Sequence, residues 1–588
     1  MARLVDTSIR LLSQEPFVGR ISTARILRLA EDLDSAGYAA LEVTGGGCFS
    51  GAVSRAVESP WERIRALKAR TTTPLVMALR GTFLVGPRPA DADLVRRFIL
   101  CAAESGIEIF RLHDPLNDVD DLVGPISAVR EAGAVVYAGL VYSEAPGGGG
   151  LVERARRLGE LGVDRVLLHD PAGALDPAGA GRLISQMGEA AGVPVGLYVQ
   201  GSGGTALAVA IEAARAGADP IATASYPVAM LTQRPAAELL TQALRGLSLD
   251  AGLDREIGWE VARRIESEIG DAAAVAPPVS PQVALRAALA TVPAGLVAAV
   301  ERRLAAVGAA DRLDEVLDEV RRVREECGSP PPAPPVGLIL ATQAIQHVLG
   351  ARRWVEVDEE MRRLLLGEYG HPPGPIDETA RAVAEATVAE DAEDLSLDHA
   401  REVAGTLATS EEELCLVALF GERALPLLES LRGRHRRLTG DEGGPDASEG
   451  ERVQRLIGML EESDLSELSL EDGDVRITLR KADQRPLTIA GPAIAQPAGP
   501  AAPAEDETDS SVIRVEAPMV GVFYRSASPS SPPFVEEGAR VEVGQTLCIL
   551  EAMKLFNELK SDHAGIVKRI AVRNADPVEY GQLLFELV

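Results

Sequence analysis

The sequence predicts a multidomain protein: a (β/α)8 barrel of the TIM type, a mostly helical domain, a linker region and a small all-β domain. Three observations support this prediction. Eight short apolar segments alternate with helix-like segments over residues 1–245. Amphipathic helical patterns then continue to about residue 435. The last 78 residues contain a repeated turn-and-strand pattern. A chain of 588 residues is also too long for one ordinary domain.

The first 245 residues have the alternation expected of a barrel. Helix-like segments such as 21–36 and 152–161 separate the apolar segments, and several end just before a glycine, which is typical of a left-handed helix cap. Eight units fit a closed barrel, whereas an open doubly wound sheet is the competing interpretation. The predicted strands are 4–9, 39–44, 74–80, 107–113, 135–142, 165–169, 194–200 and 220–226.

Shifts in composition place the domain boundaries. Residues 311–326 and 380–405 have amphipathic spacing within the helical region. Residues 436–450 are polar and rich in glycine, and residues 483–510 are rich in proline and alanine, as in an extended tether. The predicted division is therefore a barrel at 1–250, a helical domain at 251–435, a linker at 436–450, a short folded region at 451–482, a second linker at 483–510 and an all-β domain at 511–588.

Overall composition excludes several classes of function. The formal net charge of -29 argues against a nucleic-acid partner. Five scattered cysteines without a CxxC pair argue against a disulfide framework or a thiolate zinc site. The first ten residues do not have the pattern of a secretory signal, and no apolar segment approaches the ~20 residues needed to cross a membrane. We therefore expect a cytoplasmic protein that binds neither nucleic acid nor membrane.

The last domain contains an internal repeat with one lysine between its halves. The sequence VEVGQTLCIL at 541–550 is similar to VEYGQLLFEL at 578–587, and each half predicts a turn followed by a strand. Lys554 lies between predicted strands at 545–550 and 555–560, so we expect it at a hairpin tip. The chain has only five lysines, which makes this amine a candidate for modification by a tethered group. The competing interpretation is an ordinary solvated turn lysine.

Residues 512–588 resemble the biotinyl domain of biotin carboxyl carrier proteins, a small flattened β-barrel. The residues Glu551, Ala552, Met553 and Lys554, followed by leucine, match the attachment motif of that family. The resemblance implies that a biotin protein ligase attaches biotin to Lys554. Lipoyl domains share the fold, but their lysine normally lacks the flanking Ala-Met. Residues 517–534 are similar to the "thumb" of bacterial acetyl-CoA carboxylase carriers, and 451–480 resemble the N-terminal region of the same carriers.

Residues 1–377 resemble the carboxyltransferase part of pyruvate carboxylase and the alpha subunit of oxaloacetate decarboxylase. The matching segments are DTSIR at 6–10, LEV at 41–43, PWER at 60–63, LRG at 79–81, FR at 110–111, LND at 116–118, Asp170 with AG at 172–173, DRLDEV at 311–316, VRE at 323–325 and YG at 369–370 with PP at 372–373.

That family binds a divalent metal through an aspartate, a carboxylated lysine and a His-x-His pair. The corresponding positions in this sequence are Leu11, His169, Tyr198 and Gln200, so the resemblance implies that the metal site has been lost. The barrel region holds one lysine, Lys68, in a predicted helix, and its second histidine is His113. We expect no metal, and the alternative is a rebuilt site made from Asp114, His169 and Asp170.

Four substrate-side positions of the family persist: Arg10, Gln14, Arg80 and Thr232. The resemblance identifies the last three as a conserved glutamine, a substrate-binding arginine and a transfer threonine. We interpret the four residues as a remnant pocket for an anion or for biotin, or as inherited barrel structure without a ligand.

From these resemblances, the sequence predicts the biotin carboxyl carrier subunit of an acetyl-CoA carboxylase-type complex. Lys554 would carry carboxybiotin for malonyl-CoA formation in fatty acid biosynthesis, beside a barrel that is a pseudoenzyme. The expected partners are a biotin carboxylase subunit, acyl-CoA carboxyltransferase subunits and a biotin protein ligase, and we expect a homo-oligomer. The alternative is an active enzyme, either the B-type component of pyruvate carboxylase or an oxaloacetate decarboxylase of the alpha type. In a third possibility, the barrel binds a keto acid and regulates the carrier.

Overall fold

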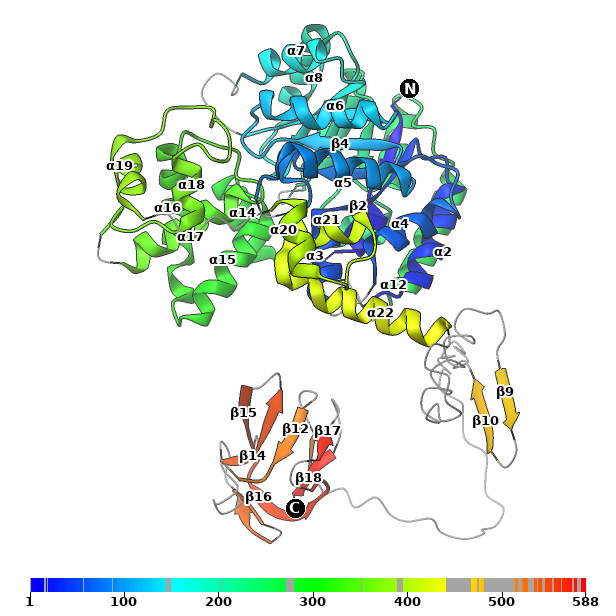
Figure 1. Cartoon of the computed structure of the whole chain (residues 1–588), viewed down its shortest axis with the longest axis vertical. Helices are drawn as coiled ribbons and strands as arrows, with labels where there is room; N and C mark the ends of the chain where they lie inside the picture. Colours follow the sequence, from blue (N-terminus) through cyan, green and yellow to red (C-terminus); the bar gives the residue numbers. More distant parts are fainter. Residues whose placement is uncertain are drawn as a thin grey trace, which may run out of the picture. The chain divides into compact units, whose positions relative to one another are not determined.

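The structure is a computed structural model that forms two compact units, residues 1–481 and 482–588, which are described separately (Figure 1). It describes residues 2–439, 467–480 and 513–587 apart from short internal segments. Those segments are 15–16, 18–19, 57, 87, 144–149, 202–203, 271–279, 351, 389–394, 473–474, 517–520, 527–533, 537, 542–544, 553–554, 562, 574–575 and 579–582.

Eight parallel strands close into a barrel in chain order, as the sequence predicts. The first and last strands pair with each other, with Val5 opposite Ala222, which rules out the open-sheet alternative. The strands are β1 (Leu4–Asp6), β2 (Ala40–Gly45), β3 (Leu75–Leu79), β4 (Ile109–His113), β5 (Val135–Val141), β6 (Arg165–Asp170), β7 (Val195–Val199) and β8 (Ile221–Thr223).

Helices surround this barrel (Figure 1). Their caps confirm the glycine pattern in the sequence, because Gly37, Gly106, Gly133, Gly162 and Gly217 all have positive φ angles. The helices are α1 (Ser8–Leu12), α2 (Thr23–Asp34), α3 (Gly46–Arg55), α4 (Pro60–Lys68), α5 (Ala92–Glu104), α6 (Val123–Glu131), α7 (Leu151–Glu160), α8 (Pro177–Ala191), α9 (Ala206–Arg215), α10 (Tyr226–Thr232) and α11 (Ala237–Gly246).

Two predicted strands are too long. The segment predicted at 4–9 ends as a strand at Asp6, and α1 begins at Ser8. The buried Asp6 carboxylate accepts hydrogen bonds from the Ser8 backbone N–H at 2.8 Å and from Ser8 Oγ at 2.9 Å. This local contact competes with the ladder and turns the chain. Similarly, β8 ends at Thr223, and the segment predicted to reach residue 226 instead leads into α10.

The region predicted as one helical domain divides into two parts. Helices α14 (Pro281–Ala290), α15 (Ala294–Ala306), α16 (Leu313–Glu326), α17 (Val336–Leu349), α18 (Glu359–Leu365) and α19 (Glu378–Ala386) have a core of their own. Helices α12 (Arg255–Ile269), α20 (Leu397–Ala404), α21 (Glu411–Phe420) and α22 (Leu425–Thr439) instead add side chains such as Ile265, Leu416 and Leu427 to the barrel core.

These helices also differ from the predicted segments in two places. The predicted helical segment 380–405 is two helices, α19 and α20, and α22 continues through Thr439 into the predicted linker.

Trp61 on α4 donates its indole N–H to Glu412 O at 3.0 Å, which fixes α21 against the barrel. Such contacts between distant segments leave no local sequence signal. Short 3-10 helices lie at Gly81–Phe83, Asp120–Leu122, Ala310–Arg312 and Gly421–Ala424.

No single helix in the described part of the chain is long and apolar enough to cross a membrane. The helical segments 282–290 and 294–306 are long and apolar enough only when they are counted together, and they meet at a bend of 114°.

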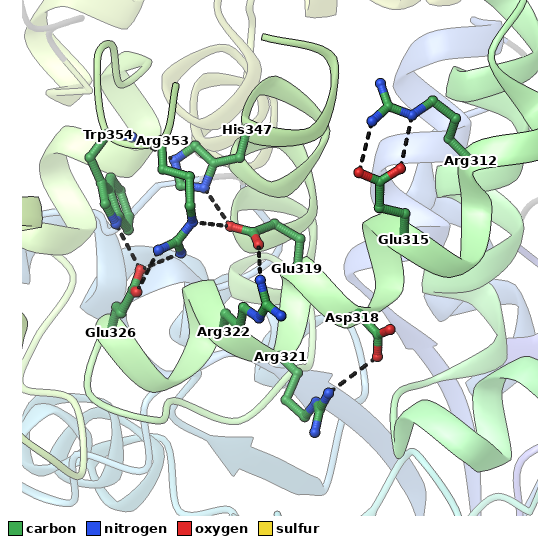
Figure 2. A network of polar contacts seen from close by, with 10 residues as sticks. All are labelled: Arg312, Glu315, Asp318, Glu319, Arg321, Arg322, Glu326, His347, Arg353 and Trp354. Atoms are coloured by element: carbon green, nitrogen blue, oxygen red, sulfur yellow. Dashed lines mark hydrogen bonds and ion pairs between the residues drawn. The ribbon is translucent and has the colours of Figure 1, made fainter. Parts of the chain in front are cut away.

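A buried polar network ties α16 to α17 and to the segment after α17 (Figure 2). His347 Nδ1 lies 2.8 Å from Glu319 Oε1, and His347 Nε2 accepts the Trp354 backbone N–H at 3.1 Å. Burial lowers the pKa of His347, so the imidazole is neutral and Nδ1 carries the proton. Arg353 joins Glu319 to Glu326, and the Trp354 indole also donates to Glu326 at 2.7 Å.

We expect His347→Ala to lower the free energy of unfolding by about 2–4 kcal/mol, because it leaves buried partners unsatisfied and opens a cavity. Arg321→Ala is the matched control on α16, since its ion pair with Asp318 is exposed (Figure 2) and should change stability by less than about 1 kcal/mol. Urea unfolding of both variants measures the difference. Equal free energies would show that the buried network contributes nothing.

A two-stranded antiparallel hairpin, β9 (Glu467–Asp472) and β10 (Val475–Arg480), lies in the predicted 451–482 region. The C-terminal unit has two four-stranded antiparallel sheets, in the orders β11-β18-β16-β13 and β15-β14-β12-β17. Their strands are β11 (Ile513–Glu516), β12 (Gly521–Tyr524), β13 (Arg540–Val541), β14 (Thr546–Ala552), β15 (Leu555–Lys560), β16 (Gly565–Ile570), β17 (Pro577–Val578) and β18 (Leu583–Leu587).

The strand order confirms the internal repeat of this unit. The repeated valines end the short edge strands β13 and β17, one in each sheet. The repeated apolar segments form β14 and β18, which are inner strands of opposite sheets. Between the sheets, Phe523 and Phe585 pack with ring centroids 5.8 Å apart, together with Leu547, Cys548 and Val567.

Candidate active site at the mouth of the barrel

A buried carboxylate and two arginines form the base of the site at the carboxyl ends of the barrel strands, where TIM-barrel enzymes place their chemistry. Glu42 on β2 accepts a hydrogen bond from Arg111 Nε on β4 at 2.8 Å and from Arg10 Nη1 on α1 at 2.7 Å. The Glu42 side chain is fully buried. Burial raises its pKa, but Arg111, Arg10 and Arg234 outweigh burial and hold the pKa at about 2. Glu42 is therefore ionised.

Two further arginines in the site lack a carboxylate partner. Arg80 Nη2 donates to Val85 O at 3.0 Å and to Gly86 O at 2.6 Å, and its Nε has no hydrogen-bond partner among the described residues. Buried Arg234 has no described partner for Nε or Nη1. Burial, assisted by repulsion from Arg10, lowers the pKa of each group to about 10. Both guanidinium groups thus remain charged at neutral pH.

Two histidines and a tyrosine lie beside this charged group. The rings of His113 and His169 are edge to face with centroids 5.8 Å apart, and Nδ1 of each has no described hydrogen-bond partner. Burial, reinforced by Arg111, lowers the pKa of both histidines well below its usual range, so both imidazoles are neutral. The Arg111 guanidinium lies over the Tyr198 ring, 4.6 Å from its centroid.

A cavity of about 840 Å³ opens above these residues, a size suited to a small-molecule substrate. Arg10, Gln14, Arg80 and Thr232 all line it, so the structure brings the four predicted substrate-side residues together. The far wall comes from the start of α15 and from residues 332–335, both in the helical region. Of the four residues at the family's metal-ligand positions, Leu11, His169 and Gln200 line the cavity. The fourth, Tyr198, lies in the barrel interior.

The residues at the metal positions do not fit a divalent cation. Leu11 is apolar and buried, and Gln200 Nε2 donates to Thr232 O at 3.3 Å. Lys68 is on α4 and pairs with Glu108, outside the cavity lining. The residues that the structure describes contain no group of three or more His, Cys, Asp or Glu side chains placed to hold a metal. The guanidinium groups of Arg10, Arg80, Arg111 and Arg234, two of them buried and two partly buried, would also repel a cation.

Asp114, His169 and Asp170, the residues of the alternative metal site, do not form a group placed to hold a metal among the described residues, and both carboxylates bind backbone N–H groups. Asp114 Oδ1 accepts the N–H groups of Leu116 and Asp118, each at 2.8 Å. Asp170 accepts four N–H groups from the loop at 172–175. Both carboxylates therefore shape the loops that follow β4 and β6.

The predicted attachment site lies on the second unit. Strands β14 and β15 pair up to Ala552 opposite Leu555, and Glu551 is opposite Phe556. Met553 and Lys554 themselves lie outside the described residues. The flanking pairs confirm a hairpin around the motif, and biotinylation of Lys554 stays a prediction.

Comparison with known proteins identifies the family. The chain is 34% identical over 380 residues to the B-type component of pyruvate carboxylase from Methanocaldococcus jannaschii, covering 64% of this chain and 67% of that protein. It is 32% identical to the protein of the same name from Methanothermobacter thermautotrophicus, covering 65% and 68%. This chain belongs to the B-type pyruvate carboxylase family. The family models "Conserved carboxylase domain" and "Biotin-requiring enzyme" match residues 288–471 and 513–587, and the latter indicates covalently attached biotin.

A third relative aligns with nearly the whole chain. The 2-oxoglutarate carboxylase large subunit of Hydrogenobacter thermophilus is 28% identical over 95% of this chain and 90% of its own length. The carboxyl transferase domain of Rhizobium etli pyruvate carboxylase superposes with a TM-score of 0.67 at 23% identity, over 73% of this chain and 77% of that one. That likeness supports the carboxyltransferase fold.

These comparisons change the functional prediction. A biotin carrier domain fused to a pyruvate carboxylase-type carboxyltransferase domain is confirmed. The acetyl-CoA carboxylase assignment and the role in fatty acid biosynthesis find no support in the named relatives, which are pyruvate and 2-oxoglutarate carboxylases. The thumb-like residues that suggested them lie mostly outside the described residues. The loss of activity predicted for the barrel is not shown either.

Proposed function

We propose that this chain is the carboxyltransferase and biotin-carrier subunit of a 2-oxo-acid carboxylase, which corresponds to the alternative prediction from the sequence. The observation that supports it most is the 840 Å³ cavity that gathers Arg10, Gln14, Arg80 and Thr232 at the barrel mouth, in one polypeptide with a biotinyl domain. The end-to-end similarity to a 2-oxoglutarate carboxylase large subunit also supports it.

The residues of the cavity suit an anionic substrate. Biotin, when attached, supplies the carboxyl group that is transferred. Arg80 and Arg10 can bind a substrate carboxylate through charge-assisted hydrogen bonds. Thr232 Oγ1 donates a hydrogen bond to Val228 O at 2.8 Å, which leaves its lone pairs available to accept a hydrogen bond from a ligand. The neutral imidazoles of His113 and His169 can donate or accept a hydrogen bond without adding charge.

The proposal includes partners. A biotin carboxylase subunit would carboxylate the biotin, and a biotin protein ligase would attach it to Lys554. We further propose a cytoplasmic homo-oligomer. The barrel itself would then replace the acyl-CoA carboxyltransferase subunits that the carrier motif alone suggested.

A carboxylation assay tests this proposal. The biotinylated protein is mixed with a biotin carboxylase, ATP and labelled bicarbonate, and pyruvate, 2-oxoglutarate, acetyl-CoA or propionyl-CoA is added as the acceptor. We expect label in a 2-oxo acid, once borohydride reduction has converted the acid-labile β-oxo-acid product to a stable hydroxy acid, and none in the acyl-CoA compounds. Arg80→Gln should lower this incorporation at least about 100-fold, since it removes a charged donor from the site. Arg96→Gln, which removes only an exposed ion pair with Glu131, is the matched control and should be unchanged. Label only in an acyl-CoA would disprove the proposal.

A further inference from the structure

The described lining of the cavity is strongly cationic. It includes five arginines and no aspartate or glutamate: Arg10, Arg80, Arg111, Arg234 and Arg423. The nearest opposing charge is Glu42, which lies beneath the cavity and bonds to Arg111 and Arg10. Both histidines in the lining are neutral, so they neither add to the positive charge nor offset it. Glu42 carries one negative charge and can therefore neutralise only one of these arginines.

The uncompensated charges are therefore on Arg80 and Arg234. Among the residues that the structure describes, Arg80 bonds only to two backbone carbonyl oxygens, and Arg234 has two N–H donors without a partner. A buried guanidinium without a counter-charge is costly for the fold. Such a cost at a cavity wall indicates a ligand that brings negative charge to both groups.

Arg10 is the arginine that influences both of these groups. Repulsion from Arg10 contributes to the lowered pKa of Arg80 and to that of Arg234. All three side chains line the same cavity, and we call them the arginine cluster. Glu42 bonds to Arg10, whereas Arg80 and Arg234 have no carboxylate partner among the described residues.

Three glycines at the junction of β2 and α3 leave room for Arg10, Arg80 and Gln14. A Cβ atom on Gly46 would lie 3.0 Å from Arg80 Nη2, and one on Gly45 would lie 3.0 Å from Arg10 Nε. A Cβ atom on Gly47 would lie 2.7 Å from Gln14 Oε1. The backbone here is packed directly against the polar groups of the site, so their positions are fixed before any ligand binds.

We propose that this arginine cluster binds a dicarboxylic 2-oxo acid without a metal, with one carboxylate at Arg80 and the other at Arg234. The inference rests on the proposed function and names its substrate class. A monocarboxylate such as pyruvate engages only one of these two arginines. The second carboxylate neutralises Arg234, the charge that the protein itself leaves unpaired among the described residues.

Equilibrium binding to the full-length protein tests this inference independently of turnover. After dialysis against EDTA, titration calorimetry should give a Kd for 2-oxoglutarate at least about 10-fold lower than for pyruvate, because a second ion pair forms. Arg234→Gln should weaken 2-oxoglutarate binding about 10- to 100-fold and leave pyruvate binding unchanged. Arg234→Lys, which retains the charge, should recover part of the loss and shows that the site remains folded.

Several results would overturn the inference. These are equal affinity for the two acids, an equal effect of Arg234→Gln on both, or binding of either acid only after a divalent metal is restored. Tight 2-oxoglutarate binding without carboxylation would instead leave the inference intact and contradict the proposed function. Carboxylation of pyruvate alone would support the proposed function and contradict the inference.

Discussion

Replacing Lys554 with arginine should abolish biotin attachment and reduce carboxylation of any acceptor to background. Biotin is joined through an amide to a primary amine, and a guanidinium group, which stays protonated, does not replace that nucleophile. Arginine preserves the positive charge between β14 and β15, so the register of Ala552 with Leu555 should persist. Intact-mass measurement and a streptavidin blot of protein produced with a biotin ligase report the attachment.

Lys560→Arg provides the matched control. Lys560 is the last residue of β15 in the same domain and pairs with Thr546 across the ladder. That variant should be biotinylated fully and should carboxylate at the normal rate. A streptavidin-positive Lys554→Arg protein would place the biotin on another residue and refute the attachment site.

The barrel and the biotinyl fold are predictable because their signals are local. Each barrel strand is a short apolar segment, and each of the five predicted capping glycines adopts the conformation that its position requires. The repeated valines Val541 and Val578 likewise end edge strands, one in each of the two sheets. The place of α12 and α20–α22 in the barrel core is not predictable in this way, because contacts such as that of Trp61 with Glu412 join residues about 350 positions apart.

The site is predictable only in part for the same reason. Arg10, Gln14, Arg80 and Thr232 follow motif matches, and the structure brings them to one cavity. Arg234 carries no motif, and only the fold shows that it is buried beside Arg10. Glu42 and Arg111 belong to the sequence segments 41–43 and 110–111, which are similar to the carboxyltransferase family. Opposite charges in otherwise apolar strands are the signal that could have identified their ion pair, since a buried charge requires a partner.

Glu42→Gln should be among the most destabilising single changes in the barrel. It removes the carboxylate that faces Arg111 and Arg10, and leaves two guanidinium groups buried without a counter-charge. Breaking a buried pair in this way costs about 3–5 kcal/mol. Chemical denaturation of the full chain, followed by tryptophan fluorescence, measures the loss. Glu131→Gln is the control, because its exposed pair with Arg96 should contribute less than about 1 kcal/mol.

The pH dependence of that difference identifies its electrostatic origin. The pKa of Glu42 is about 2 in the folded protein, below the value of about 4.3 for an unfolded chain. Its stabilisation is therefore complete above about pH 5 and is lost as pH falls through 4 towards 2, because the unfolded state binds the proton first. We expect the gap between wild type and Glu42→Gln to be constant from about pH 8 to 6 and to shrink below about pH 4. A gap independent of pH down to the acid limit would mean that packing of the side chain, and not its charge, holds the arginines in place.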